Sequence, residues 1–202
     1  MELFSTAKPS LGFVKNYQPG KPIEELEREY GIRNVIKMAS NENALGPSPK
    51  ALAAVQKALK DIHRYPDGGC FYLRNKLADF LGINAGNLVF GNGSDELLVL
   101  VVRALVGGGD EVIIADPTFL IYEIATQVEG GKLIKVPMKN FQYDLDTMKD
   151  KISEKTKLIF IANPDNPVGT YMPKEKLLQF LKRVPKDVVV VLDEAYYEFA
   201  KE

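Results

Sequence analysis

The sequence predicts an α/β fold with a mostly parallel sheet that carries helices on both faces. From Leu88 onward, short apolar runs alternate with segments of helical periodicity, which is the pattern of repeated strand–helix–strand units. The clearest run is 188–192, where β-branched residues follow one another without polar alternation. Such a run predicts a strand buried on both faces. Polar loops follow four of the predicted strands, and a parallel sheet would bring these loops to one edge, where ligands bind.

Size and composition predict an ordinary globular protein. The 202 residues are enough for one α/β domain or somewhat more, and the chain is 46% hydrophobic and 26% charged. A net charge of −1 points neither to nucleic acid nor to an anionic membrane surface. The single cysteine, Cys70, suits a reducing cytosol, and the sequence shows no secretory signal and no run long enough to span a bilayer. We therefore expect a cytoplasmic protein that binds neither nucleic acid nor membrane.

The sequence of residues 1–82 predicts an arm followed by short helices. Residues 1–22 lack periodicity and are rich in proline and glycine, which predicts an arm that needs a surface to pack on. An acidic amphipathic helix is predicted at 23–30, because Pro22 suits its first turn and Gly31 its end. The next predicted elements are a strand at 35–38, a polar loop at 40–47, a helix from Pro49 to about Leu59, a loop at 63–69 and a helix at 71–81 that stops at Gly82.

The second part predicts the sheet. Apolar runs mark strands, and longer amphipathic segments between them mark the crossover helices. The predicted strands are 88–90, 111–115, 132–136, 157–162 and 188–192. The predicted helices are 97–106, the segment after Phe119 to about Glu129, 145–152 and 174–183. The four polar loops at strand ends begin at Gly91, Asp116, Asn163 and Asp193.

The loop Gly91-Asn-Gly93-Ser94 leads into a predicted helix and could bind a phosphate. A helix N-terminus offers unpaired N–H groups, and glycine lets a phosphate approach the backbone. The loop is no dinucleotide fingerprint, because Glu96 stands where the third glycine would be, and no Gly-Lys-Ser/Thr of a Walker A loop follows. The alternative is that Ser94, Asp95 and Glu96 are an ordinary N-cap and acidic first turn. Taken by itself, the loop favours this structural alternative.

The other three loops each carry a residue that could hold a ligand. Asp193 ends an apolar strand, where a carboxylate needs a cation or hydrogen-bond donors, and Tyr196 follows it. Phe119 could stack on a ring, and Asn166 lies between two prolines that hold its backbone rigidly. Structural alternatives stay open: a solubilising or helix-capping role for Asp193, core packing for Phe119 and an Asx turn for Asn166. The only histidine, His63, gives no basis for a metal cluster.

Taken together, these loops resemble those of the fold-type I pyridoxal-phosphate (PLP) aminotransferases. Residues 163–169, Asn-Pro-Asp-Asn-Pro-Val-Gly, are similar to the family's N-P-x-N-P-T-G loop, and 190–196 is similar to its strand ending in D-E-A-Y. Further motifs resemble the histidinol-phosphate aminotransferase subfamily: Tyr17-Gln-Pro-Gly-Lys21, Ser40-Asn-Glu-Asn43 with Gly46, Arg64-Tyr-Pro-Asp67 and Gly91-Asn-Gly-Ser-Asp-Glu96. The resemblance covers the whole chain. It implies the fold-type I large domain, truncated before the C-terminal small domain.

The resemblance implies PLP as the cofactor and a role for each residue near its ring. Asp193 would pair with the protonated pyridine nitrogen and keep the ring able to accept electrons. Asn166 and Tyr196 would hydrogen-bond the 3′-oxygen. Phe119 would stack on the ring, where the family often has tyrosine. Val168 stands in place of the family's usual threonine, a mild departure.

It also implies residues for the phosphate and the substrate. Gly93, Ser94 and the backbone N–H of Asp95 would hold the phosphate. Tyr65 would reach across a dimer interface to the phosphate of the cofactor in the other subunit. The residues expected near the substrate are Asn43 and Gly46.

One family residue has no counterpart here. The family's catalytic lysine forms a Schiff base with PLP and lies a few tens of residues beyond the D-E-A-Y strand, so we expect it downstream of Glu202. Lys201 is too close to Asp193 to be that lysine. The arginines that bind the phosphate and the substrate carboxylate are also expected downstream. We therefore expect no catalytic residue in this chain, and little or no activity from the chain alone.

The implied reaction moves an amino group between glutamate/2-oxoglutarate and imidazole-acetol phosphate/histidinol phosphate, in histidine biosynthesis. The expected partners are a small-molecule amino donor, a 2-oxo acid and a second copy of the chain in a homodimer. Alternatives are an aromatic or broad-specificity aminotransferase, a phospho-amino-acid decarboxylase of the same fold, or a non-catalytic dimerising fragment. A nicotinamide dehydrogenase is disfavoured by the glycine pattern at 91–96. We expect an N-terminal arm and small-domain segment at 1–46 and an incomplete PLP-binding large domain at 47–202.

Overall fold

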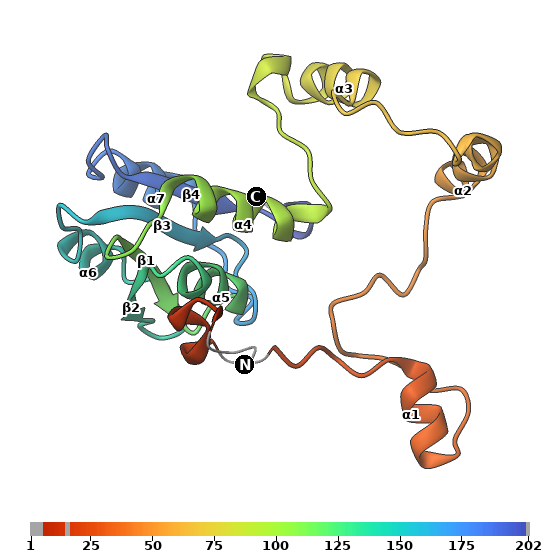
Figure 1. Cartoon of the computed structure of the whole chain (residues 1–202), viewed down its shortest axis with the longest axis horizontal. Coiled ribbons are helices and arrows are strands. Elements are labelled where there is room, and N and C mark those ends of the chain that lie inside the picture. Colours follow the sequence, from red (N-terminus) through yellow and green to blue (C-terminus); the bar gives the residue numbers. More distant parts are fainter. Residues whose placement is uncertain (1–5, 15–16, 201–202) are drawn as a thin grey trace. The chain divides into compact units, whose positions relative to one another are not determined.

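A computed structural model describes residues 6–14 and 17–200 of the chain (Figure 1). The chain divides into two compact units, one made of residues 1–15 and 89–202 and the other of residues 16–88. The sequence predicts a different boundary, between an N-terminal segment at 1–46 and the large domain at 47–202. That boundary stays a prediction.

The first unit is built on a four-stranded parallel sheet in the order β2-β1-β3-β4 (Figure 1). The strands are β1 Glu111–Asp116, β2 Lys132–Pro137, β3 Thr156–Ala162 and β4 Val189–Asp193. Because all four run in the same direction, the loops that follow β1, β3 and β4 leave the sheet at one edge.

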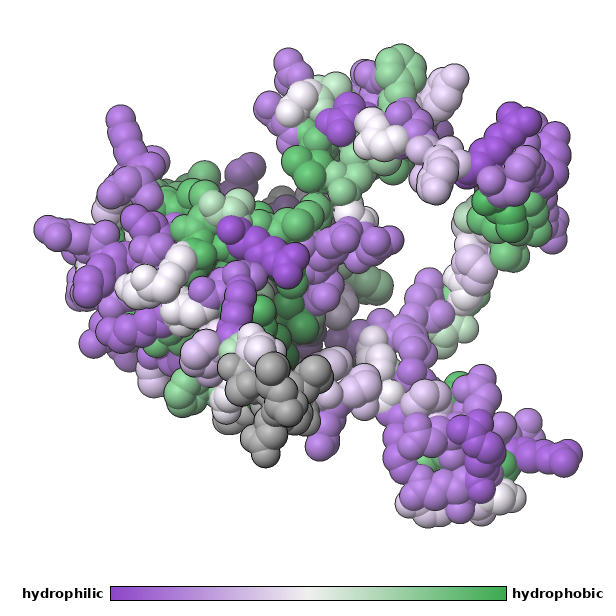
Figure 2. All heavy atoms as spheres, viewed as in Figure 1, coloured by the Kyte–Doolittle hydropathy of each residue, from purple (hydrophilic) through white to green (hydrophobic). Residues whose placement is uncertain are grey.

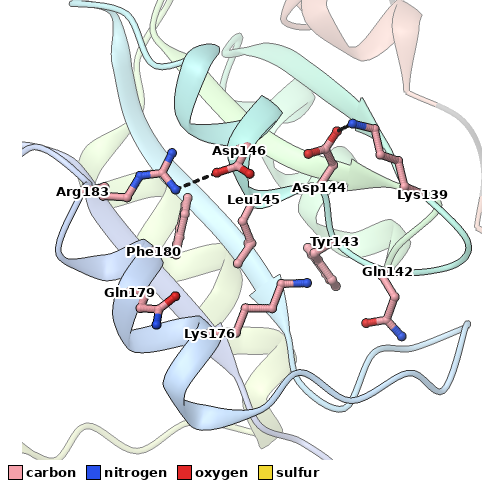
Figure 3. Close-up of a pocket in the computed structure, with 10 residues that line it drawn as sticks. All are labelled: Lys139, Gln142, Tyr143, Asp144, Leu145, Asp146, Lys176, Gln179, Phe180 and Arg183. Atoms are coloured by element: carbon pink, nitrogen blue, oxygen red, sulfur yellow. Dashed lines mark hydrogen bonds and ion pairs between the residues drawn. The ribbon is translucent and has the colours of Figure 1, made fainter.

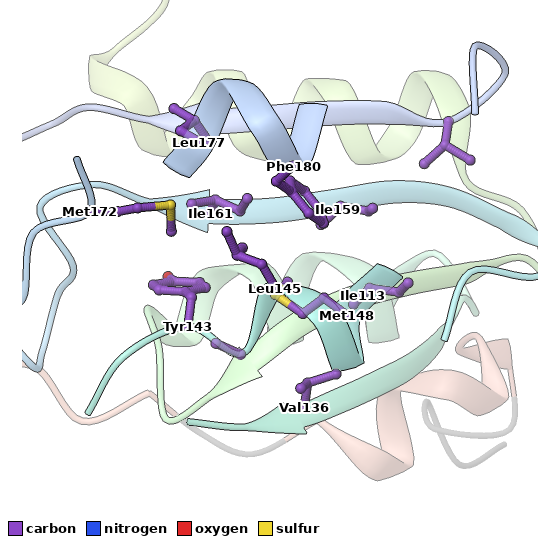
Figure 4. Close-up of a cluster of buried hydrophobic side chains, with 12 residues drawn as sticks. Ile113, Val136, Tyr143, Leu145, Met148, Ile159, Ile161, Met172, Leu177 and Phe180 are labelled. Carbon is purple, nitrogen blue, oxygen red and sulfur yellow. The ribbon is translucent and has the colours of Figure 1, made fainter. Parts of the chain in front are cut away.

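Helices cover both faces of this sheet, as predicted. Alternate residues of the central strands point to opposite faces and form two separate cores. On one face, α4 Gly93–Leu105 and α5 Leu120–Val128 pack on β1 and β3. On the other face, α6 Leu145–Asp150 and α7 Lys174–Leu181 contribute Leu145, Met148, Leu177 and Phe180 to the core that Figure 4 shows.

The described part of the N-terminal arm packs on the first unit. A short 3-10 helix, Pro9–Phe13, contacts α5. The ammonium of Lys8 pairs with the carboxylate of Glu129 at 2.8 Å, and the hydroxyl of Ser10 donates to the carbonyl of Val128 at 3.3 Å. The predicted arm therefore has a surface to pack on, at the end of α5.

The second unit carries three predicted helices with matching bounds: α1 Ile23–Tyr30, α2 Pro49–Ala58 and α3 Phe71–Leu81. Gly31 and Gly82 end α1 and α3 in the left-handed conformation that glycine tolerates. No residue of α1 or α2 is buried. Figure 2 shows apolar side chains gathered on one side of α2. Val55 of this helix is 58% exposed.

Two predicted strands are wrong. Residues 35–38 and 88–90 form no strand, because neither segment has a neighbouring strand to pair with in the described part of the chain. Ile36 is 86% exposed, and the carbonyl of Leu88 instead accepts a hydrogen bond from the guanidinium of Arg74. An apolar run of three or four residues is too short to specify a strand without a partner.

The prediction that β4 is buried on both faces holds only in part. Val190 and Leu192 pack against one core and Val191 against the other, but each is only partly buried. In the described chain, β4 pairs with β3 alone and forms an edge of the sheet. Val189 is 43% exposed, and Asp193 is the one residue of β4 that is buried. The β-branched run therefore indicates a strand correctly but not its place in the sheet.

Candidate functional site

A pocket lies at the carboxyl ends of β3 and β4, where the polar loops meet. Its walls come from four segments: the first turn of α4, the start of α5, the loop after β3 and the loop after β4. The lining residues are Ser94, Phe119, Tyr122, Ala162, Pro164, Asn166, Asp193, Ala195 and Tyr196. The predicted gathering of the four loops is confirmed, although the first of them follows an irregular segment rather than a strand.

Asp193 is fixed in this pocket by two donors. Its side chain is 9% exposed. The hydroxyl of Tyr122 donates to Oδ2 at 2.7 Å, and the backbone N–H of Ala195 donates to Oδ1 at 3.1 Å. None of the ion pairs among the described residues includes Asp193. A buried carboxylate with donors but no countercharge is suited to a cationic group of a ligand.

Tyr122 is a site residue that the sequence analysis missed. It is fully buried, its ring stacks on Phe160 at 4.5 Å, and the ring of Phe119 meets it edge-on at 5.7 Å. Burial, together with the hydrogen bond to Asp193, raises the pKa of the Tyr122 hydroxyl well above its ordinary value, so the hydroxyl remains a donor. The spacing of three residues from Phe119, which puts both rings on one side of α5, was the available signal.

Phe119 belongs both to the core and to the pocket lining. It is half-buried at the N-cap of α5 and packs against the core formed by α4, α5 and the sheet. It also lines the pocket. The functional and structural interpretations of Phe119 are therefore compatible.

The loop after β3 is closed by side-chain hydrogen bonds at its base. The amide of Asn163 donates to the carbonyl of Met172 at 2.9 Å and accepts from the N–H of Met172 at 2.7 Å. Asn166, which lines the pocket, is half-buried, and its amide forms no hydrogen bond within the described residues. The turn is instead made by Asp165, whose Oδ1 accepts from the N–H of Val168 at 3.1 Å. This arrangement leaves the Asn166 amide available for a ligand.

Helix α4 begins at Gly93, four residues earlier than predicted, so Gly93 and Ser94 of the predicted phosphate loop belong to its first turn. Ser94 lines the pocket, whereas Gly93 and Asp95 are exposed residues outside its lining. The carboxylate of Glu96 turns back and accepts from the N–H of Asn92 at 2.7 Å. One of the two acidic side chains of this turn is therefore held by the backbone. The acidic first turn of the structural alternative is confirmed, but the N-cap is Asn92 and not Ser94.

The remaining predicted site residues belong to the second unit. Tyr65 is fully exposed there. Asn43 makes an Asx turn in which Oδ1 accepts from the N–H of Leu45 at 3.0 Å, and its amide donates to the carbonyl of Gly46 at 3.4 Å. Gly46 has a φ of +74°, which favours glycine. The pocket described above contains none of these three residues.

A second, larger cleft of about 480 Å³ lies between α6 and α7 (Figure 3). Its charges are largely paired: Lys139 with Asp144 and Arg183 with Asp146, each at 2.6 Å. The hydrogen bond from Lys139 lowers the pKa of the Asp144 carboxyl to about 2. Because these charges already have partners, the pocket at the strand ends is the better candidate site.

Metal and membrane features are lacking in the part of the chain that the structure describes. No group of three or more His, Cys, Asp or Glu side chains there could hold a metal ion. No helix there has both the length and the apolar composition needed to cross a bilayer.

Comparison with known proteins supports one family. The family model described as "Aminotransferase class I and II" matches residues 33–202. The chain is 52% identical over 186 residues to the histidinol-phosphate aminotransferase of Moorella thermoacetica, covering 92% of this chain and 48% of that protein. It is 51% identical over 192 residues to the enzyme of that name from an Anaeromyxobacter species, covering 95% and 53%. The chain thus spans about half the length of the curated relatives it matches.

A solved structure shares the fold. The crystal structure of histidinol-phosphate aminotransferase from Sinorhizobium meliloti, in complex with pyridoxal-5′-phosphate, superposes with a TM-score of 0.89 and 31% identity. The match covers 99% of this chain and 54% of that one. The predicted fold class, that of the fold-type I aminotransferase large domain, is confirmed. Since the family model matches most of its length, the chain belongs to the class I and II aminotransferase family.

Proposed function

We propose that this chain binds PLP and forms the cofactor-binding part of a histidinol-phosphate:2-oxoglutarate aminotransferase. The observation that carries the proposal is the buried Asp193 carboxylate, which two donors orient and no described cation neutralises. A protonated pyridine nitrogen is a cation of the size and polarity that such a carboxylate suits. Support for the substrate comes from two relatives named histidinol-phosphate aminotransferase, to which the chain is 52% and 51% identical.

When bound, PLP supplies an electron-withdrawing ring that stabilises negative charge on the substrate carbon. The chain's contribution is to hold that ring. Asp193 would keep the ring nitrogen protonated, because an adjacent carboxylate favours the charged form. Tyr122 and the N–H of Ala195 would keep the carboxylate in one orientation. Phe119 would offer its face to the ring, which excludes water from that side.

The other lining residues fit the oxygen atoms of the cofactor. Asn166 and Tyr196 line the side of the pocket formed by the loops after β3 and β4, and both would donate to the 3′-oxygen. Ser94 stands in the first turn of α4, where its hydroxyl and the N–H of Asp95 would bind the phosphate, with Gly93 beside them. These proposed roles rest on the amide, hydroxyl and N–H donors that these residues carry.

We extend the proposal to the partners and compartment expected from the sequence. The substrates would be histidinol phosphate as amino donor and a 2-oxo acid. The enzyme would be a homodimer, in which Tyr65 reaches the phosphate of the other subunit's cofactor and Asn43 with Gly46 lies near the substrate. The exposed position of Tyr65 is compatible with such a contact. A cytoplasmic location would suit the single cysteine and the near-neutral net charge.

Titration of the chain with PLP tests the proposal directly. We expect saturable binding seen in the cofactor absorbance, and binding at least ~10-fold weaker for Asp193→Ala, because loss of a charged hydrogen-bond partner costs about 1.5–3 kcal/mol. Asp144→Ala removes a carboxylate of the second cleft and is the matched control, whose affinity should equal that of the native chain. Equal affinity for Asp193→Ala and the native chain would refute the proposal. For the complete enzyme, comparing turnover of histidinol phosphate with that of phenylalanine would test the substrate.

A further inference from the structure

Asp165 is a buried carboxylate to which the proposed function gives no part. It is 3% exposed and lies in the loop after β3, next to Asn166. Its Oδ2 accepts from the hydroxyls of Tyr143 at 2.7 Å and Thr118 at 3.1 Å, and its Oδ1 accepts from the N–H of Val168 at 3.1 Å. No ion pair of the described residues includes Asp165. Hydrogen bonds alone therefore satisfy this charge, an arrangement that is costly unless every bond is made.

The two hydroxyls come from segments outside the loop. Thr118 follows β1, and Tyr143 precedes α6 and is 5% exposed. Tyr143 also accepts from the N–H of Ala162 at 3.0 Å, at the end of β3, and its oxygen lies 3.2 Å from that of Thr118. Burial raises the pKa of the Tyr143 hydroxyl above its ordinary value, so it stays protonated and donates. The carboxylate of Asp165 thus ties its loop to two other parts of the sheet's edge.

The residues on either side of Asp165 are the ones that face the pocket. Pro164 and Asn166 both line it, whereas Asp165 points away into the core. The Asn166 amide has no hydrogen bond within the described residues, so its own contacts do not orient it. The position of Asn166 therefore depends on its backbone. The side-chain hydrogen bonds of Asp165, the preceding residue, hold that backbone in place.

We propose that Asp165, together with Tyr143 and Thr118, is a positioning group that holds Asn166 against the pocket. This inference rests on the proposed function only where it assumes that Asn166 contacts the cofactor. Its structural part, the anchoring of the loop, does not depend on the cofactor. The two parts can therefore be tested separately.

A double-mutant cycle tests the link to the cofactor. Tyr143→Phe removes one donor to Asp165 and the acceptor of the Ala162 N–H, and it leaves the ring in place. We expect it to weaken PLP binding about tenfold in the native background and to have no further effect in the Asn166→Ala background, since groups acting through one another are not additive. Thr118→Val should act in the same direction. Val136→Ala, a change in the same core as Tyr143 but on β2, controls for lost stability and should leave affinity unchanged.

Three results of the cycle would overturn the link: no effect of Tyr143→Phe, an equal effect in both backgrounds, or an equal effect of Val136→Ala. If Asn166→Ala itself binds PLP as the native chain does, Asn166 has no cofactor role, and that part of the proposed function fails.

Amide hydrogen exchange tests the anchoring without cofactor. In the Tyr143→Phe variant, the N–H groups of Val168 and Gly169, which bond to Asp165, should exchange several-fold faster, while those within α5 keep their native rates. The side-chain amide signals of Asn166 should also broaden or shift. Unchanged exchange at Val168 would overturn the anchoring, whether or not the chain binds PLP. A chain that binds no PLP but shows the faster exchange would refute the proposed function and leave the anchoring intact.

Discussion

At the scale of single residues, the site depends on carboxylates whose environments are set by neutral donors. Asp193 and Asp165 are both buried, and each accepts a hydrogen bond of 2.7 Å from a buried tyrosine, Tyr122 or Tyr143. Neither forms an ion pair within the described residues. The difference lies in what they face, because Asp193 lines the pocket and Asp165 does not. The carboxylate of Asp193 is therefore available to a ligand, whereas that of Asp165 forms hydrogen bonds only within the protein.

Tyr122→Phe tests the role of the first tyrosine. The variant keeps the ring stack with Phe160 but leaves Oδ2 of Asp193 without its donor, so a cost of about 1–3 kcal/mol in unfolding free energy is expected. We expect the affinity for PLP to fall as well, because the carboxylate loses its fixed orientation. Urea unfolding and PLP titration of the same sample measure the two effects. A stability loss without any change in affinity would make Tyr122 a purely structural residue.

The residues that carry the site differ in how far the sequence could predict them. Asp193, Asn166, Phe119 and Ser94 follow strands or open a helix, and a parallel sheet has to bring such positions to one edge. Tyr122 was not predicted, because only the folded structure brings its hydroxyl to a carboxylate 71 residues away. Contacts of that kind depend on strand order, which periodicity does not encode.

At the scale of elements, periodicity predicted the helices and the long strands well. Helices α1 and α3 match the predicted bounds, and each ends at the predicted glycine, because glycine caps are local signals. The segments 35–38 and 88–90 were predicted wrongly as strands, and the burial of β4 was overestimated. Whether a segment forms a strand, and how deeply that strand is buried, depends on the strands that pair with it. Those strands come from distant parts of the chain.

The start of α6 provides a prediction at this scale. Asp144 caps the helix, accepting from the N–H of Thr147 at 3.2 Å and from its hydroxyl at 2.6 Å, and it pairs with the exposed Lys139. Asp144→Ala should lower the unfolding free energy at neutral pH by about 1 kcal/mol, the usual cost of losing such a cap. Asp144→Asn should lose less, since an amide still caps. Urea unfolding at pH 7 measures both, and a larger loss for Asn than for Ala would contradict the cap.

The same cap should make stability depend on pH. The pKa of Asp144 is lowered from 3.8 to about 2, first by the hydrogen bond from Lys139 and then by that from Thr147. A lowered carboxyl pKa contributes stability that is present above the unfolded value and lost as the pH falls through the folded value. The native chain should therefore lose this contribution between about pH 4 and pH 2, and the difference from Asp144→Ala should shrink over the same range. A constant difference down to pH 2 would argue against it.

At the scale of the whole molecule, the two units differ in how their apolar residues are used. The first unit buries two cores against its sheet, whereas the second leaves large side chains such as Ile36, Met38 and Leu45 more than four-fifths exposed. Apolar surface on that scale is expected to be covered in a functional assembly. A homodimer, as proposed for this chain, would provide such cover.

The pocket lining also determines how the chain should react with PLP. The lining described here offers a carboxylate, an amide, hydroxyls and an aromatic face, but no lysine. A lysine next to the cofactor would be needed for a covalent bond with it. We therefore expect the 202-residue chain, incubated with PLP and then with borohydride, to keep its mass of 22.5 kDa without a stoichiometric adduct. Intact-mass spectrometry measures this, with Asp193→Ala as the control for non-specific labelling of surface lysines. One adduct per chain, lost in Asp193→Ala, would mean that a lysine of this chain reaches the pocket and that the catalytic group is present after all.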